Sequence, residues 1–374
     1  MRTNGLPVFL SVISLTIRCG AWVMPTNRTP RNRLLQAVSS TASDINTFER
    51  WCRDQGCNWN SAVSHAYFLD GRIRGLQWTG KARPAQPECA VSIPNTIVLS
   101  VEDNDTMWDA KLACKLWEEM QLGTRSSVSG YCSWLATANG KSYVPNTVPS
   151  TTVPNALRHW AEAEKESLSA KPAGQKLVEL QKKQDAAWRE KYQPYSDVLS
   201  WEAFEWCMEV VHSRAFRGIG SSVSVIPAIT APLLAAFAGW YYVTIVNPLA
   251  TTSKGDDTLL TLLGVAGLLF ASFPTALQLL QKPIVALLPL IDSANHLEAA
   301  DSQIEYVPSK KTFDLFIGPQ CIDNDTSQLY ISYGKQSDEA LLLNHGFLPN
   351  VQKRPGDTGS IRQSLIEVFH ARNP

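Results

Sequence analysis

The sequence predicts a mixed fold, mainly β with helices (α+β), that is interrupted by a two-helix transmembrane hairpin. Three observations lead to this prediction. Short strand-like runs occur in "CAVSIP" and "TIVLSV", an amphipathic helix in "TMWDAKLACKLWEEMQLG" stops at Gly123, and two long uncharged runs follow Arg217. The 374 residues suffice for one large domain or two smaller ones, and 34 basic against 34 acidic residues leave no electrostatic footprint for nucleic acid.

The first 43 residues have the features of a targeting presequence and are not expected to be part of the fold. Residues 1–21 resemble a signal peptide, with an apolar run at 6–17 followed by the small residues Cys19-Gly20-Ala21. Residues 22–43 contain no acidic residue before Asp44 and have the composition of a transit peptide. This order resembles the bipartite presequences of secondary plastids in algae. The alternative is a simple signal peptide with an unstructured start.

The segments that follow alternate between strand and helix signals. "INTFERWCRDQG" has helical spacing and ends at Gly56, and "SHAYFLDGRIRGLQW" has a hairpin turn at Asp70-Gly71. Residues 155–217 are strongly helical, and Ser200 is a suitable N-cap for their last helix. The dense charge of this region indicates solvated helix faces.

Two uncharged runs then predict a membrane hairpin over residues 219–281. "VIPAITAPLLAAFAGWYYVTIV" is 22 residues long, and Thr258 to Leu280 also contains no charge. About 20 apolar residues suffice to cross the hydrocarbon core. The alternative is a pair of buried helices in a soluble protein. Basic residues at 214, 217 and 282 favour the cytoplasm-equivalent side, the stroma in a plastid, for both flanking halves.

Four motifs flank this hairpin in a fixed order: "RIRGLQW", "VVHSRAFR", "LIDSANH" and "ISYGKQSDEALLLNHGF". Together they resemble the SET-domain protein methyltransferases of the Rubisco large-subunit lysine methyltransferase type. The resemblance covers roughly residues 44–350, the predicted SET-type domain, and leaves 351–374 as a C-terminal tail. It implies a SET-type knotted β-fold with a helical insert, S-adenosyl-L-methionine as cofactor and a protein substrate.

The resemblance also implies roles for individual residues. Tyr333 would be catalytic, beside the transferred methyl group, and Arg214 would pair with the cofactor's carboxylate. Gly75 would let the backbone approach the cofactor closely. The implied cofactor-binding residues are Arg74, Gly75, Leu76, Ser213, Arg214, Asp292, Asn295 and His296, and the implied substrate-binding residues are Tyr306, His345 and Phe347. Methyl transfer to an amine requires no metal, and no metal site is predicted.

The leading functional hypothesis is a protein-lysine N-methyltransferase tethered by two spans to a plastid membrane, with its soluble halves facing the stroma. The alternative is a catalytically inactive SET-like membrane scaffold that binds a protein partner; an endoplasmic reticulum or other endomembrane location is the alternative address. A small transporter subunit is disfavoured because both spans lack charged residues. The eight cysteines form no CxxC pair, which argues against a structural zinc site or disulfide scaffold and favours a reducing compartment.

Overall fold

Three small sheets and a set of helices form the part of the chain that the computed structural model describes, residues 44–68, 73–137, 143–151, 156–170, 172–220 and 282–347. The predicted α+β class is therefore confirmed in its coarse form. The emphasis on β was wrong, because helices span more of the described residues than strands do.

The first sheet has the order β1-β4-β10-β9 and is antiparallel throughout. Its strands are β1 (Asn58–Trp59), β4 (Glu88–Pro94), β10 (Thr312–Ile317) and β9 (Ser302–Val307). β4 is the strand expected from "CAVSIP". Its partner β10 lies more than 200 residues later in the chain, so the N-terminal and C-terminal halves share one sheet.

The second sheet brings three of the four sequence motifs together. Its order is β2 (Val63–Phe68), β3 (Ile73–Trp78), β11 (Gln328–Ile331) and β8 (Asn295–His296). β2 and β3 pair antiparallel on either side of the expected turn, whose residues 69–72 lie outside the described ranges. β11 runs antiparallel to β3 and parallel to β8, so "RIRGLQW", "LIDSANH" and "ISYG" become neighbours.

The third sheet is formed around the predicted membrane segment. β5 (Leu99–Glu102), β7 (Lys282–Leu287) and β6 (Ala215–Gly220) pair antiparallel, and the register places Gly220 opposite Lys282. Gly220 and Lys282, the two described residues that flank 221–281, are therefore neighbours. Ile219 and Gly220 belong to β6, so the interruption begins two residues later than the predicted boundary at 219.

Both predicted spans lie within 221–281, which is outside the described residues. The presequence 1–43 and the tail 351–374 are outside the described residues as well. Among the helices that the structure does describe, none combines the length and the hydropathy needed to span a membrane.

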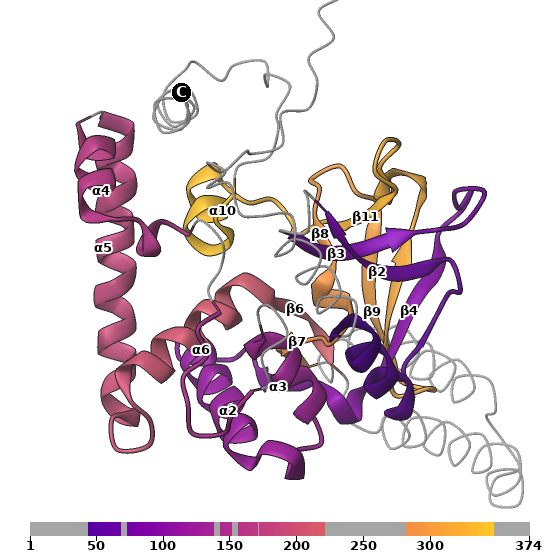
Figure 1. Ribbon diagram of the computed structural model, residues 1–374, viewed down its shortest axis with the longest axis horizontal. Coiled ribbons are helices and arrows are strands. Elements are labelled where there is room, and N and C mark those ends of the chain that lie inside the picture. Colours follow the sequence, from indigo (N-terminus) through magenta and orange to yellow (C-terminus); the bar gives the residue numbers. More distant parts are fainter. Residues whose placement is uncertain are drawn as a thin grey trace, which may run out of the picture.

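The helices lie mostly to the left of the strands and below them in Figure 1. A helix over residues 44–54 precedes β1, and Gly56 follows it with a positive φ of 85°. The labelled helices are α2 (Trp108–Leu122), α3 (Ser129–Ala136), α4 (Glu162–Ser169), α5 (Pro172–Tyr192), α6 (Trp201–Arg214) and α10 (Asp338–His345). The predicted helix at α2 is confirmed, and so is Ser200 as the N-cap of α6, since its Oγ accepts from the backbone N–H of Ala203 at 3.2 Å.

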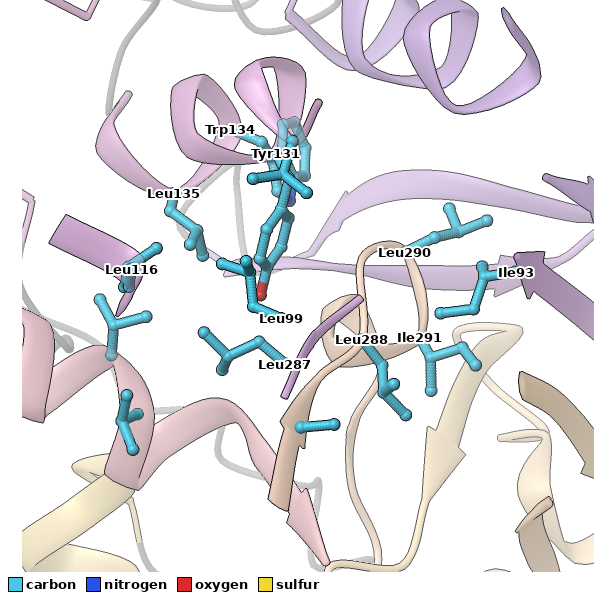
Figure 2. Packing of buried hydrophobic residues seen from close by; sticks show 14 of the residues in the cluster. Ile93, Leu99, Leu116, Tyr131, Trp134, Leu135, Leu287, Leu288, Leu290 and Ile291 are labelled. Carbon is cyan, nitrogen blue, oxygen red and sulfur yellow. The ribbon is translucent and has the colours of Figure 1, made fainter. Parts of the chain in front are cut away.

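One apolar cluster joins helices and sheets beside the motifs. α3 contributes Tyr131 and Trp134, which Figure 2 shows on the side of the cluster facing Leu99 and Leu287 of the third sheet. Leu288, Leu290 and Ile291 continue the same cluster toward "LIDSANH". The loop that carries the charged and polar motif residues is thus anchored by buried aliphatic side chains.

Candidate functional site

A cavity of about 490 Å³ opens where β6, β7 and β9 meet the loop between β11 and α10. This volume lies within the range of small-molecule sites. Six predicted site residues line the cavity: Ser213, Arg214, Asp292, Tyr306, Tyr333 and His345. The other six, Arg74, Gly75, Leu76, Asn295, His296 and Phe347, do not line it.

Asp292 is the centre of a buried polar cluster at the cavity wall. Its Oδ2 accepts from the Tyr131 hydroxyl at 2.7 Å and from Arg214 Nη1 at 3.2 Å, and Nη1 also donates to the Asp292 carbonyl at 3.1 Å. Burial disfavours the charged form of Arg214, but the charge and hydrogen bond of Asp292, together with Tyr131 and Tyr333, outweigh burial and raise the pKa of Arg214. Arg214 therefore already has an anionic partner, whereas the sequence had assigned it to a ligand carboxylate.

The backbone holds Asp292 in place through an uncommon turn. Leu290 has φ 74° and ψ −50°, and the N–H of Ile291 donates to the Pro289 carbonyl at 2.9 Å. This is a γ-turn, a strained conformation for a non-glycine residue. Leu290 and Ile291 are both buried, so their packing can stabilise the strained turn that presents Asp292.

Arg74, Gly75 and Asn295 form a second cluster, across β3 and β8. Asn295 Nδ2 donates to the Arg74 carbonyl at 3.2 Å, and the Arg74 guanidinium lies over the Trp134 ring at 4.0 Å. Burial, followed by the charge of Arg214, lowers the pKa of Arg74 to about 10. A Cβ on Gly75 would lie 2.7 Å from Asn295 Nδ2 and 2.9 Å from the Phe68 ring, so a larger residue would displace these side chains.

Tyr333 links β8 to the cavity. Its backbone N–H donates to His296 Nδ1 at 3.1 Å, its hydroxyl donates to the Ala294 carbonyl at 2.9 Å, and its ring stacks on His296 at 4.9 Å. Burial raises the pKa of Tyr333 to about 12, so the phenol stays protonated near neutral pH. Burial likewise lowers the pKa of His296.

His345 and Phe347 extend this aromatic group from the end of α10. The His345 ring lies 4.9 Å from the Tyr333 ring and 6.0 Å from the Phe347 ring, and Phe347 lies 6.2 Å from His296. Burial, followed by the charges of His296, Arg214 and His212, lowers the pKa of His345 to about 4. His345 is therefore neutral near neutral pH and contributes a nitrogen lone pair or an N–H group.

The remaining predicted residues have supporting positions. Tyr306 lines the cavity from β9 and packs on Phe313 at 5.0 Å. Ser213 also lines it, but its hydroxyl donates to the Val210 carbonyl of its own helix. Leu76 is fully buried in β3 opposite Leu329, so it supports the site through the core.

The sequence reasoning missed two features of the site. Tyr131 belongs to no recognisable motif, and only its hydrogen bond to Asp292 reveals its role. His212 lines the cavity and its Nε2 contacts Asp109 Oδ2 at 3.1 Å. Its position directly before Ser213-Arg214 was the available signal, but Asp109 lies 103 residues earlier in the chain.

Comparison with known proteins gives similar solved structures but no sequence family. No family model matches the chain, and no curated protein matches its sequence. The chain is similar to the solved SET domain of LSMT bound to methyl-lysine and AdoHcy, with 14% identity and a TM-score of 0.46. The match covers 82% of this chain and 57% of that chain, so this protein spans little more than half the length of that structure.

Proposed function

We propose that this protein is an S-adenosylmethionine-dependent protein-lysine N-methyltransferase that acts at a plastid membrane. One observation carries the proposal. Three of the four motif segments, far apart in the sequence, contribute residues to a single cavity, where Asp292 holds Arg214 and Tyr333 stacks on His296. The fourth segment, "RIRGLQW", lies outside the cavity lining, in β3 beside β11. The resemblance of the motifs to SET-domain methyltransferases requires the segments to meet in this way.

The residues present fit the cofactor. Asn295 Nδ2 donates to the Arg74 carbonyl and lies against Gly75, so the β3 backbone and the Asn295 amide present polar groups side by side that would bind the cofactor's amino-acid end. Asn295 and His296 would hold the amino-acid end and the adenine, and Arg214, which is fixed on Asp292, would supply a positive charge in the cavity. The cofactor supplies an electrophilic methyl group on a sulfonium centre.

The protein itself would contribute by aligning the substrate lysine with the methyl group, in a cavity where Tyr333 stays uncharged. Tyr333 presents a protonated hydroxyl fixed on the Ala294 carbonyl, and its oxygen lone pair can orient the reacting groups. Tyr306, Phe313 and Phe216 give the same cavity an apolar side that would accept the methylene chain of lysine. Preorganised dipoles of this kind stabilise a transition state in which charge shifts from sulfur to nitrogen.

His345 would provide a neutral hydrogen-bonding ring at the substrate end. Since its pKa is about 4, it adds no positive charge that would repel a lysine ammonium group. It lies against Tyr333, so it can orient the amine toward the methyl group.

Membrane attachment through residues 221–281 is the second part of the proposal. Its support is the β6–β7 register, which lets a long insertion leave the domain without separating its two halves. The uncharged runs of that insertion and the bipartite composition of residues 1–43 support attachment to a plastid membrane with the domain on the stromal side.

Isothermal titration calorimetry with S-adenosylmethionine tests the proposal. The wild type should bind, and Asn295→Ala should bind about tenfold to a hundredfold more weakly, since loss of a positioned polar contact costs about 1–3 kcal/mol. Asn104→Ala is a matched control, because Asn104 is bonded to Glu102 outside the cavity. Absence of binding by the wild type would reject the enzyme and leave the inactive SET-like scaffold.

A further inference from the structure

A second charged cluster reaches the same cavity through His212. His212 Nε2 lies 3.1 Å from Asp109 Oδ2, and Lys191 Nζ contacts both carboxylate oxygens of Asp109 at 2.7 Å. Asp109 is buried, with 3% of its side chain exposed, and comes from α2; Lys191 comes from α5 and His212 from α6. Three helices therefore meet to hold one imidazole at the cavity.

The geometry fixes the ring and its tautomer. Burial opposes ionisation of Asp109, but the hydrogen bonds and charges of His212 and Lys191 together outweigh it and lower the pKa of Asp109. An ionised carboxylate accepts a hydrogen from Nε2, which leaves the lone pair on Nδ1. Within the described ranges, no hydrogen bond occupies Nδ1. The ring is further held between Trp188 at 5.2 Å and Trp108 at 5.7 Å.

Lysine methylation needs an acceptor for one proton, and three other ionisable cavity residues suit this task poorly. Tyr333 has a pKa of about 12 and is a phenol near neutral pH, and His345 has a pKa of about 4 and binds protons weakly. Asp292 is committed to Arg214 and Tyr131. His212, by contrast, has the carboxylate partner that stabilises an imidazolium ion once it forms.

We propose that Asp109 and His212 form a general-base dyad at the cavity. In this dyad His212 Nδ1 takes the proton from the substrate lysine ammonium, and Asp109 orients the imidazole ring. This inference rests on the proposed methyltransferase function. The freed amine lone pair then forms the nitrogen–carbon bond as the carbon–sulfur bond of the sulfonium breaks, which leaves a neutral thioether. His212 releases its proton to solvent, to which 20% of its side chain is exposed.

Several charged groups face this imidazole and bear on its pH dependence. Asp109 and, behind it, Lys191 are its direct neighbours, and His345 of α10 lies near enough to feel its charge. Arg214 shares its helix and lines the same cavity, while Arg217 of β6 lies over the other contacting ring, Trp108, at 4.8 Å and pairs with Asp103 at 3.7 Å. Asp292 completes the charged lining.

The test is a pH–rate profile of the full chain with methyl-tritiated S-adenosylmethionine and poly-L-lysine as the probe. His212→Gln keeps an amide that can donate to Asp109 but removes the base. Transfer at pH 7.5 should fall about a hundredfold, the lower end for loss of a general base, and the deficit should shrink below about tenfold near pH 10, where solvent deprotonates lysine. The Km for S-adenosylmethionine should change less than about threefold.

Two further variants separate catalysis from structure. Asp109→Asn should also lower transfer at neutral pH and shift the profile, because the ring loses its orienting carboxylate. His159→Asn is the matched control: His159 Nε2 contacts Glu209 at 2.9 Å but does not line the cavity, so its profile should match the wild type.

The possible results distinguish this inference from the proposed function. A deficit in His212→Gln that is equal at all pH values, or none at all, overturns the base assignment. A wild type that binds S-adenosylmethionine but never methylates poly-L-lysine overturns it as well. Failure of the wild type to bind S-adenosylmethionine rejects the methyltransferase itself, and the base assignment with it.

Discussion

Tyr131→Phe tests the claim that a buried tyrosine holds the charged centre of the site. The Tyr131 hydroxyl donates to Asp292 Oδ2 at 2.7 Å, both residues are buried, and Asp292 Oδ1 has no hydrogen-bond partner in the described part of the chain. The change leaves the ring in place, so it removes one hydrogen bond and almost no packing. A hydrogen bond to a charged group contributes about 1.5–3 kcal/mol.

This magnitude converts into a measurable change in stability. About 2–4 °C in Tm per kcal/mol, as expected for a domain of this size, gives a decrease of about 3–12 °C in circular-dichroism melts. S-adenosylmethionine binding should also weaken, because Arg214 shares the Asp292 oxygen that Tyr131 stabilises.

Tyr192→Phe is the matched control. Its hydroxyl donates to the neutral Leu199 carbonyl at 2.9 Å and lies outside the cavity, so it should cost only about 0.5–1.5 kcal/mol and leave cofactor binding unchanged. Equal Tm losses and unchanged binding in both variants would refute the role given to Tyr131.

Three other predictions concern the pH dependence of stability, residues 221–281 and the targeting presequence 1–43. The pKa of His345 is lowered from 6.5 to about 4, so between these pH values the unfolded chain binds the proton more readily than the folded chain does. The free energy of unfolding, measured by urea titration, should therefore fall as the pH drops from 6.5 to 4, and His345→Phe should reduce that fall. An equal fall in the variant and the wild type would contradict the lowered pKa. Residues 221–281 can be replaced with Asn-Gly, a two-residue turn suited to the antiparallel Gly220–Lys282 pair. This variant should remain folded in the absence of detergent, as measured by circular dichroism. An aggregated product would favour buried helices in this segment. Fusion of residues 1–43 to a fluorescent reporter should direct it to the plastid in an alga with secondary plastids, and retention in the endoplasmic reticulum would support the simple signal peptide.

Local sequence signals predicted much of the secondary structure. The helix ending at Gly123 formed because its apolar spacing, its stop residue and its tertiary partner α6 all agree, and Gly123 takes a φ of 55° that favours glycine. Ser200 capped α6 for a similarly local reason. "TIVLSV" was predicted less well, because Asn95–Ile97 form a 3-10 turn and only Leu99–Glu102 form strand β5.

The candidate site was harder to predict because its contacts are long-range. The motif order indicated which segments would meet, but not that Arg214 would pair with Asp292 across 78 residues. Tyr131 and Asp109 carry no local pattern, since a tyrosine or an aspartate on an amphipathic helix usually needs no special explanation. Their roles follow from the tertiary fold, which places each beside a buried charged or titratable partner.

Methyl transfer itself tests the central claim most directly. Full-length wild type should move the tritiated methyl group from S-adenosylmethionine to the side-chain amines of poly-L-lysine, with methyl-lysine recovered after hydrolysis. Tyr333→Phe should bind S-adenosylmethionine as the wild type does but transfer at least about tenfold more slowly, because only the orienting hydroxyl is lost. Transfer by Tyr333→Phe at the wild-type rate, or no methyl-lysine from a wild type that binds S-adenosylmethionine, would contradict the account.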